Sequence, residues 1–416
     1  MDKFKRALSG GLALVLSLAT VSCGGGDSSP ASGSSGNTTV PAASNVVSVV
    51  VDAGPSSDAV NTLYTTVTVC VPGSTTECQT IDHIQVDTGS NGLRILAPVL
   101  TLSLPVATAS DGNSLVECTQ FVDGYSWGPV ASAGVQIAGE SASTVPVQVI
   151  GASNFSTVPA ACSSTGPAED TVAQFGANGI LGIGLFEQDC GGECATSTTG
   201  GYYYSCSPTA CSPIEAPLNT QVLNPVPLFQ TDNNGSILVL PSVAASGAST
   251  VSGSLIFGID TESNNASGSQ TVLTVEPGSA PYPLMPGDLT TVYGGQTLTD
   301  SFIDSGTNGI FFNDSSIAAC TSSNFSGFYC PSVALNLTAT LTGVNNVSVT
   351  VNFSVANAQT LTTNDPTYTA FATLGGAYSS STTTFDWGLP FFYGRRVATA
   401  IEAHSTSVGT GPYVAF

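Results

Sequence analysis

Two short segments of the sequence each place an aspartate between β-forming residues and glycine-containing turn residues. The first reads QVDTGSNGLRI (85–95) and the second reads FIDSGTNGIFF (302–312). Asp87 and Asp304 occupy the same position in these segments and lie 217 residues apart. A chain of 416 residues is long enough for two domains. The repetition therefore predicts two copies of one unit, each presenting an aspartate at the end of a strand.

Two aspartates that are brought together can supply an acid and a base to one reaction. Carboxyl groups within hydrogen-bonding reach share a proton, because two like charges at that distance are costly. The charged carboxylate can take a proton from a water molecule, and the protonated one can donate to the carbonyl oxygen of a peptide bond. The pair therefore predicts hydrolysis by an activated water, with no covalent intermediate, no cofactor and no metal.

The residues beside the two aspartates are suited to hold them in place. Thr88 and Ser305 can hydrogen-bond the backbone of the opposite loop, and Ser90 and Thr307 can bond the outer carboxylate oxygens. The competing interpretation is that DTGS and DSGT are ordinary Asx-turns between strands. A single copy would favour that interpretation, whereas the matched pair favours a site. Six residues are thus predicted to support the pair: Thr88, Gly89, Ser90, Ser305, Gly306 and Thr307.

The rest of the chain has the residue pattern of a β protein. Short runs rich in β-branched residues, such as VVSVVV, TTVTVCV and VSVTVNFSV, are separated by clusters of Gly, Pro, Ser and Asn. The best short helix candidate is SSIAAC (315–320). The pattern predicts an all-β fold in two lobes, an N-terminal one over residues 45–250 and a C-terminal one over residues 251–416.

The first residues have the pattern of an export signal. MDKFKR is basic, and LALVLSLATVSC is apolar, ends in small residues and is too short for a comfortable membrane span. TVSC resembles a bacterial lipobox, although Thr20 replaces the usual leucine. We therefore expect residues 1–23 to be a signal peptide with Cys23 as the lipidated residue; cleavage by an ordinary signal peptidase is the alternative. Residues 24–44 are Gly- and Ser-rich and predict a flexible tether.

These features predict an exported protein of the bacterial cell envelope, at the outer membrane or in the periplasm, with secretion as the alternative. Contact with the membrane is expected only through the N-terminal lipid. After Cys23 the chain carries 27 carboxylates against three arginines, a net charge of −24. Such a surface repels phosphate, so nucleic acid is excluded as a partner.

The remaining ten cysteines form an even number, which in an exported chain predicts disulfides. Four of these cysteines could instead form a zinc site, but their spacing is poor for one, and no metal is expected. These four are Cys190, Cys194, Cys206 and Cys211. Two short loops are predicted to be closed by the bridges Cys70–Cys78 and Cys320–Cys330.

A second pair of segments follows the aspartates in the same order. FGANGILGIGLF (175–186) and FDWGLPFFYG (385–394) each contain an apolar pair followed by glycine, where one backbone passes close to another. Together with the two aspartate motifs, these segments resemble the pepsin-type aspartic endopeptidases over residues 45–416. FVDGYSWGPVASAGVQIAGE (121–140) resembles the flap hairpin of that family. More narrowly, the chain resembles a family of uncharacterised proteobacterial lipoproteins with the same pattern.

The resemblance implies a pepsin-like bilobal fold with a cleft between two related β-lobes. It implies a monomeric endopeptidase that acts on peptides or unfolded proteins, with Asp87 and Asp304 as its catalytic residues. The flap residue over the cleft is then expected to be Tyr125 or Trp127.

Two departures from the family's sequence pattern favour a function other than peptide hydrolysis. Arg94 stands where the family usually has a tryptophan, and an arginine facing the aspartates would favour their charged forms. Asp123 stands where the flap tyrosine is expected. The alternative function is therefore a catalytically silent lipoprotein with the pepsin fold that binds peptide or glycan in the cleft.

A third interpretation comes from serine hydrolases. Residues 124–128, GYSWG, fit the G-x-S-x-G motif around Ser126, and Asp386 and His404 follow in the order of a triad. That motif requires a strand, a sharp turn and then a helix. The sequence after Pro129 continues instead with the alternation of a strand, so this interpretation is disfavoured.

Overall fold

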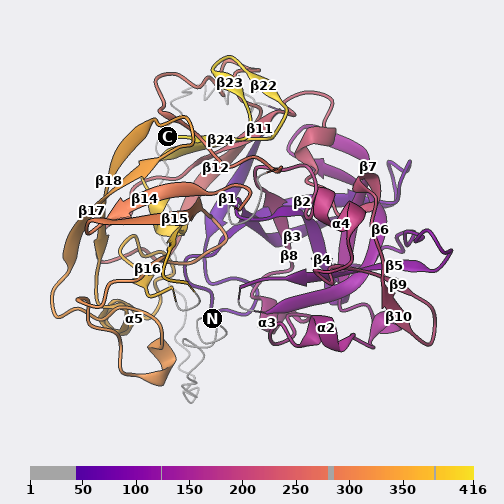
Figure 1. Cartoon of the computed structure of the whole chain (residues 1–416), viewed down its shortest axis with the longest axis horizontal. Coiled ribbons are helices and arrows are strands. Elements are labelled where there is room, and N and C mark those ends of the chain that lie inside the picture. Colours follow the sequence, from indigo (N-terminus) through magenta and orange to yellow (C-terminus); the bar gives the residue numbers. More distant parts are fainter. Residues whose placement is uncertain (1–43, 123, 280–284, 379–380) are drawn as a thin grey trace, which may run out of the picture.

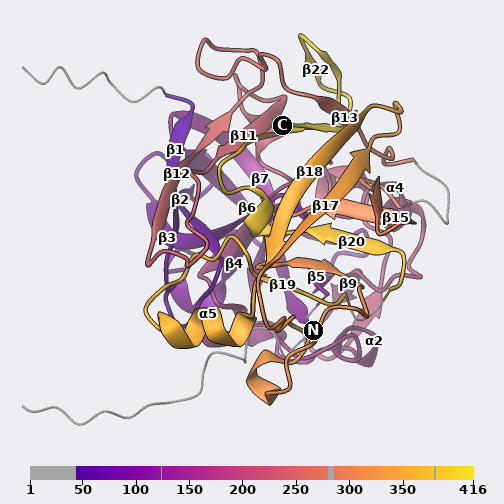
Figure 2. The same cartoon turned by 90° about the vertical axis from the view of Figure 1, so that its left-hand side faces the viewer.

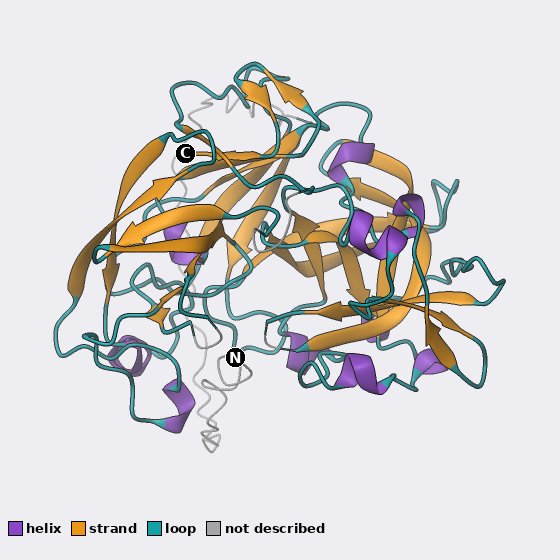
Figure 3. Ribbon diagram, in the orientation of Figure 1, coloured by secondary structure: helices purple, strands orange, loops and turns teal. Residues whose placement is uncertain are grey.

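The structure is a computed structural model that describes residues 44–122, 124–279, 285–378 and 381–416. Strands make up most of the regular structure (Figure 3), as the sequence predicts. None of the helices within these ranges is long and apolar enough to cross a membrane. The helices in these ranges are short: α2 (Ala160–Ser163), α3 (Val172–Phe175), α4 (Gly192–Thr196) and α5 (Ala358–Asn364), with single 3-10 turns at Ala97–Val99, Ser153–Phe155, Leu218–Thr220, Val226–Leu228, Ser323–Phe325 and Leu389–Phe391.

Six strands of the N-terminal half form a closed barrel. Each pairs with the next in the order β2–β3–β8–β4–β7–β6, and β6 pairs back with β2. The inward residues are mostly Val, Ile and Leu, which fit a pleated, half-buried surface. The strands are β2 (Leu63–Cys70), β3 (Cys78–Asp87), β4 (Asn91–Leu96), β6 (Tyr125–Ile137), β7 (Glu140–Ile150) and β8 (Gly179–Ile183).

A hairpin extends from this barrel. The N-terminal part of β6 pairs with β5 (Ser114–Gln120), and beyond the end of β5 the Phe121 N–H donates to the Gly124 carbonyl at 2.8 Å. Two further strands continue the sheet beyond β5, namely β9 (Tyr203–Cys206) and β10 (Cys211–Pro213). This hairpin occupies the position that the sequence assigns to the flap.

The C-terminal half contains a second sheet of seven strands. In Figure 1 these orange and yellow strands lie beside the indigo and magenta strands of the barrel, and Figure 2 shows β17 and β18 in front, with α5 below them. In sheet order the strands are β18 (Ser348–Val355), β17 (Leu335–Thr342), β14 (Leu289–Tyr293), β15 (Gln296–Ile303), β20 (Thr384–Trp387), β16 (Ile310–Phe312) and β19 (Gly375–Gly376).

Six further strands continue the barrel sheet beyond β2, and they come from the start, the middle and the end of the described chain. In order these are β1 (Val46–Val51), β12 (Val251–Phe257), β11 (Gly235–Val239), β21 (Arg396–Ala400), β24 (Tyr413–Ala415) and β13 (Val272–Thr274); a separate ribbon is formed by β22 (Ser405–Thr406) and β23 (Gly409–Thr410). The molecule is thus mainly β, with two barrel-like sheets.

All ten cysteines of the described chain form disulfides. The predicted bridges Cys70–Cys78 and Cys320–Cys330 are present. The four cysteines considered for zinc pair with one another instead, so their thiolates are not available as ligands. The other three bridges are Cys118–Cys162, Cys190–Cys194 and Cys206–Cys211.

The prediction of a helix at residues 315–320 is wrong. The segment is a turn, because the Asp314 carboxylate accepts hydrogen bonds from both the backbone N–H and the hydroxyl of Ser316, at 2.9 and 2.6 Å. Such local bonds compete with helix formation. Cys23, the predicted signal peptide and almost all of the predicted tether lie outside the described residues.

Candidate active site

Asp87 and Asp304 lie at equivalent places in the two halves. Asp87 is the last residue of β3, which runs parallel to β8, and Asp87 is opposite Gly182. Asp304 directly follows β15, which runs parallel to β20, and its backbone N–H donates to the Trp387 carbonyl at 3.0 Å. Each aspartate therefore starts a loop whose path is fixed by a parallel neighbouring strand.

The two glycine segments lie against these loops. A Cβ atom on Gly182 would stand 2.7 Å from the Asn91 backbone, and one on Gly388 would stand 2.1 Å from the Gly309 carbonyl oxygen. Both contacts are closer than real Cβ atoms allow, so only glycine fits at either place. The two halves thus repeat a contact as well as a sequence motif, because in each half a glycine packs against the loop that follows the aspartate.

Thr88 and Ser305 tie the two loops together. The Ser305 N–H donates to the Thr88 hydroxyl at 3.0 Å, and the Thr88 N–H donates to the Ser305 hydroxyl at 3.1 Å. Each hydroxyl then donates its own proton to a carbonyl of the opposite half: Thr88 to Ile303 at 3.1 Å, and Ser305 to Val86 at 2.9 Å. All of these groups are buried, so the four bonds fix the separation of the loops.

The loops bring the two carboxyl groups together, so that a Cβ atom on Gly306 would meet an oxygen of each, at 2.6 Å for Asp87 and 3.0 Å for Asp304. A Cβ atom on Gly89 would lie 2.5 Å from the Asp304 carboxyl carbon, and one on Gly306 would lie 2.6 Å from an Asp87 oxygen. Each glycine is therefore the surface against which the opposite carboxyl rests. Burial raises the pKa of Asp304 well above its usual value, and the Asp87 charge raises it further.

Each carboxyl is also held by its own loop. Asp87 accepts from the Gly89 N–H at 2.7 Å and from the Ser90 hydroxyl. Asp304 accepts from the Gly306 N–H at 2.7 Å and from the Thr307 hydroxyl at 2.8 Å. The arrangement is a pair of adjacent carboxyls held in fixed orientations. Such a pair can act as base and acid at once.

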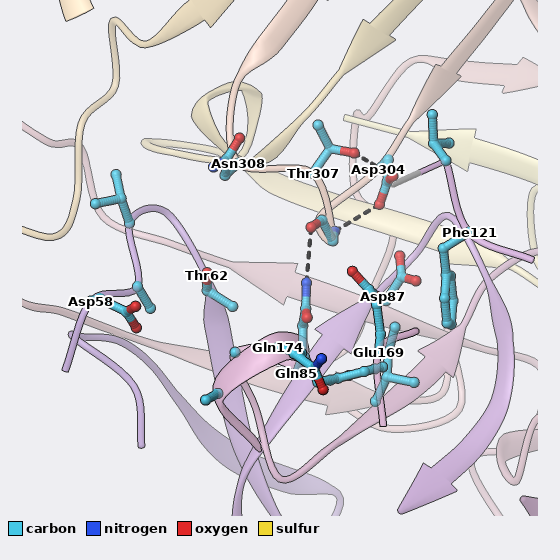
Figure 4. Close-up of a pocket in the computed structure, with 18 of the residues that line it drawn as sticks. Asp58, Thr62, Gln85, Asp87, Phe121, Glu169, Gln174, Asp304, Thr307 and Asn308 are labelled. Atoms are coloured by element: carbon cyan, nitrogen blue, oxygen red, sulfur yellow. Dashed lines mark hydrogen bonds between the residues drawn. The ribbon is translucent and has the colours of Figure 1, made fainter. Parts of the chain in front are cut away.

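A cavity of about 170 Å³ opens beside the pair (Figure 4). Its apolar lining includes Phe121, Val122, Phe175, Ile180 and Phe311. The polar residues around it come from both halves: Asp58, Thr62, Gln85, Asp87, Glu169, Gln174, Asp304, Thr307 and Asn308. An extended chain segment could reach both carboxyls from this cavity.

The hairpin turn contributes to the cavity, but through other residues than the sequence indicates. Phe121 lies beside the two carboxyls in Figure 4, and Val122 also lines the cavity. Tyr125 and Trp127 do not: both are buried in an apolar cluster with Tyr204, and the Trp127 indole N–H donates to the Phe155 carbonyl at 2.7 Å. Asp123 lies outside the described residues.

Arg94 does not face the aspartates. It is buried in the N-terminal half, where its guanidinium donates to Glu117 at 2.6 Å and to Asp189 at 3.1 Å. It also donates to the Thr119 hydroxyl at 2.9 Å. Burial alone would lower the pKa of Arg94, but the two carboxylates outweigh it and raise that pKa. Arg94 therefore holds strand β5 of the hairpin in place. It does not change the charge of the aspartate pair by direct contact.

The serine hydrolase constellation is not assembled. Ser126 is fully buried inside strand β6, and its hydroxyl donates to the Glu169 carbonyl at 3.4 Å. His404 interacts with Glu187 at 3.2 Å. Asp386 lies near Asp304 instead. A strand occupies the place where a nucleophile elbow needs a turn and a helix. Within the described ranges, no group of three or more metal-ligating residues is arranged to hold an ion.

Three residues of the site are ones that the sequence did not single out for it. The Gln85 amide donates to the Gly306 carbonyl at 2.8 Å and so links β3 to the opposite loop. Phe121 does not stand where the flap tyrosine is expected, since that position is occupied by Asp123. Asp386 was visible as an acid inside the apolar segment FDWG, a conflict that could have marked it as a functional residue.

Two comparisons with known proteins complete this description. A family model described as "Protein of unknown function (DUF3443)" matches residues 41–416, which include every residue of the site. No curated protein matches the sequence.

Proposed function

We propose that this chain, which belongs to the DUF3443 family, is an aspartic endopeptidase with a pepsin-like bilobal fold. Asp87 and Asp304 are its catalytic residues. The observation that carries the proposal is the pair of adjacent carboxyls held by reciprocal Thr88–Ser305 bonds at the edge of a cavity. Such bracing restricts the two groups to one relative geometry, which is what concerted acid and base catalysis needs.

In the proposed reaction the pair carries one proton. The charged carboxylate takes a proton from a water molecule held between the two groups, and the oxygen of that water attacks the carbonyl carbon of the peptide bond. The protonated carboxyl donates its proton to the carbonyl oxygen, which becomes a hydroxyl of the tetrahedral intermediate. As that intermediate collapses, the carboxyl that took the water's proton gives it to the leaving amine, and one hydroxyl of the intermediate gives its proton to the other carboxylate, so the pair again carries one proton. No cofactor takes part.

The cavity supports a peptide or an unfolded protein as substrate. Its aromatic and aliphatic lining suits apolar side chains. The charged residues among those lining it are acids only, namely Asp58, Asp87, Glu169 and Asp304. Acidic side chains beside the scissile bond would be repelled, so we propose that apolar and basic ones are preferred.

A catalytically silent binding protein remains the second candidate. It is favoured by the hairpin turn, because Phe121 and Val122 reach the cavity without a side-chain donor, whereas Tyr125 and Trp127 are packed elsewhere. Such a protein would hold peptide or glycan without turnover. The bracing of both carboxyls weighs against this candidate, since a site that only binds has no need for a proton-sharing pair.

We also propose that the protein is exported and anchored to the cell envelope by a lipid on Cys23, as a monomer. The five disulfides of the described chain support an oxidising compartment. Labelling with radioactive palmitate tests the anchor: wild type should incorporate label, and Cys23→Ala should not.

The experiment that tests the enzymatic function is cleavage of an unfolded protein at acidic pH, with and without a pepstatin-like transition-state mimic. Inhibited cleavage supports an aspartic endopeptidase. Binding of peptides without cleavage at any pH supports the silent binding protein.

A further inference from the structure

The cavity beside the aspartate pair has a polar end. In the view of Figure 4, Asp58 and Thr62 lie on the side of the cavity away from Phe121, and Asp87 and Asp304 lie between. Asp58 belongs to the loop between β1 and β2 and is half-buried. A substrate side chain that extends from the aspartate pair toward this end of the cavity would therefore meet the Asp58 carboxylate.

No cation within the described chain neutralises Asp58. The basic side chains of that part of the chain interact elsewhere, and none of them lines the cavity: Arg94 with Glu117 and Asp189, Arg395 with the Phe391 ring, Arg396 with backbone carbonyls, His83 with Asp52 and Asp82, and His404 with Glu187. Burial raises the pKa of Asp58, as expected for a carboxyl whose charge has no counterion beside it. A ligand that carries a positive charge would supply that counterion.

Gln85 offers a second acceptor in the same cavity. The side chain of Gln85 is 6 % exposed and lines the cavity. Its Nε2 donates to the Gly306 carbonyl at 2.8 Å, which fixes the orientation of the carboxamide. Its Oε1 accepts no hydrogen bond from the described residues, although the polar atoms of a buried side chain usually have partners. A donor group on a ligand would satisfy this oxygen.

The lining next to Asp58 also includes an apolar surface. Val60 and Phe311 both line the cavity, are both buried and belong to one apolar cluster. Lysine and arginine side chains bury their aliphatic stems on apolar surface while the charged head reaches a polar group. An apolar surface with a carboxylate and a fixed amide oxygen therefore suits a long basic side chain better than an acidic or a short polar one.

We propose that Asp58 is a specificity-determining residue, which binds the positively charged side chain of a lysine or arginine in the peptide substrate, with Gln85 Oε1 as a second acceptor. This inference rests on the proposed function, because it takes a peptide as the ligand of the cavity. It goes further by assigning the preference for a basic side chain to one carboxylate outside the catalytic pair.

The test uses statine-containing peptides, which mimic the transition state of peptide hydrolysis and are not cleaved. The peptides form matched pairs that differ in charge but little in shape, lysine against norleucine and arginine against citrulline. The varied residue is placed in turn at each position near the statine. Calorimetry at pH 7 gives the dissociation constants for wild type, Asp58→Asn, Asp58→Glu and a control, Glu77→Gln, which alters an exposed acid outside the cavity.

Wild type should bind the basic member of a pair at least about tenfold more tightly than the neutral member at one of these positions. Whichever pair shows the larger ratio identifies the head group that the site prefers. Asp58→Asn should reduce the ratio to about twofold or less, and Asp58→Glu should keep most of it. Glu77→Gln should keep the full ratio, because it removes a charge from the surface and not from the cavity.

Two results overturn the inference. The first is equal binding of both members of every pair by wild type, which is decisive even if an Asp58 variant does not fold. The second is a ratio that persists in Asp58→Asn or falls to the same extent in Glu77→Gln, because the charge that attracts the basic side chain would then lie elsewhere.

Failure of the proposed function is detected separately, by the cleavage of an unfolded protein. Wild type that cleaves but binds both members of each pair equally keeps the proposed function and loses this inference. Wild type that cleaves nothing, but prefers basic peptides through Asp58, keeps the binding site and loses the enzymatic function. Wild type that neither cleaves nor binds the peptides loses both.

Discussion

Ser305 and Thr88, which are 217 residues apart, each accept a hydrogen bond from the backbone N–H of the other. This reciprocal pair joins the two halves of the molecule directly beneath the carboxyl groups. Ser305→Ala would leave the Thr88 N–H buried without its acceptor, at a cost of about 1–3 kcal/mol. We expect a lower Tm and at least roughly a tenfold loss of kcat/KM, because the two loops lose their fixed separation.

The matched control is Ser141→Ala, at an exposed position on strand β7. Its Tm and kcat/KM should equal those of wild type. If Ser305→Ala behaves like this control, the bracing of the pair is not needed for its function.

Gly306 offers a test that leaves every polar atom in place. Its backbone dihedrals permit alanine, but the added Cβ would lie 2.6 Å from an Asp87 oxygen and must push that carboxyl away. Gly306→Ala should therefore lower kcat/KM by at least about tenfold. Gly192→Ala is the control, because a Cβ there meets nothing within 4 Å. Equal activity of the two variants would mean that the pair tolerates a different separation.

The buried Arg94 predicts a stability effect away from the active site. Arg94→Met would leave Glu117 and Asp189 buried without their cation, at a cost of about 3–5 kcal/mol. Arg396→Met, at a half-buried arginine that bonds only backbone carbonyls, should cost far less. Tm values from thermal unfolding distinguish the two.

The Arg94→Met effect should depend on pH. In the variant, burial and the loss of the guanidinium, whose charge lowers the pKa of Asp189, hold that pKa above the value in the unfolded chain. The protonated form of Asp189 is then favoured by folding, so stability is retained at low pH and lost as the pH rises. The loss of Tm should accordingly be smaller at pH 4 than at pH 7. A loss of the same size at both pH values would contradict the assigned ion pairs.

The electrostatic surroundings of Asp288 predict that the stability of the wild-type protein depends on pH. Burial, with the charges of Asp300 and Glu276, raises the pKa of Asp288 to about 8. A carboxyl whose folded pKa is raised destabilises the folded state progressively as the pH rises from about 4 to about 8. Asp288→Asn removes this penalty.

The variant should match wild type near pH 4 and be more stable at pH 8, by about 1–2 kcal/mol after allowing for solvent screening at a partly exposed group. Urea unfolding at both pH values measures the difference. A variant that is less stable than wild type at pH 8 would show that Asp288 has a partner that its charge needs.

The aspartate pair could be predicted from the sequence because the chain repeats itself. The loops that follow Asp87 and Asp304 match residue by residue, and the conformation of a tight turn depends mainly on the residues within it. The short disulfides were found for the same reason. The partners of Arg94 were not, since Asp189 lies 95 residues away and only the closed barrel brings it near. Phe121 lines the cavity in place of Tyr125 and Trp127, because the register of the hairpin directs those two side chains into an apolar cluster.

The measurement that tests the central claim most directly is the rate of cleavage of denatured haemoglobin between pH 3 and pH 7 by wild type, Asp87→Asn and Asp304→Asn. Each variant should lose at least ~10³-fold in kcat/KM, because one carboxyl cannot be base and acid in the same step. Ser126→Ala should keep most of the activity, since that hydroxyl is buried within β6. Wild-type activity that survives in both aspartate variants, or that is lost in Ser126→Ala alone, would contradict the claim that this is an aspartic endopeptidase.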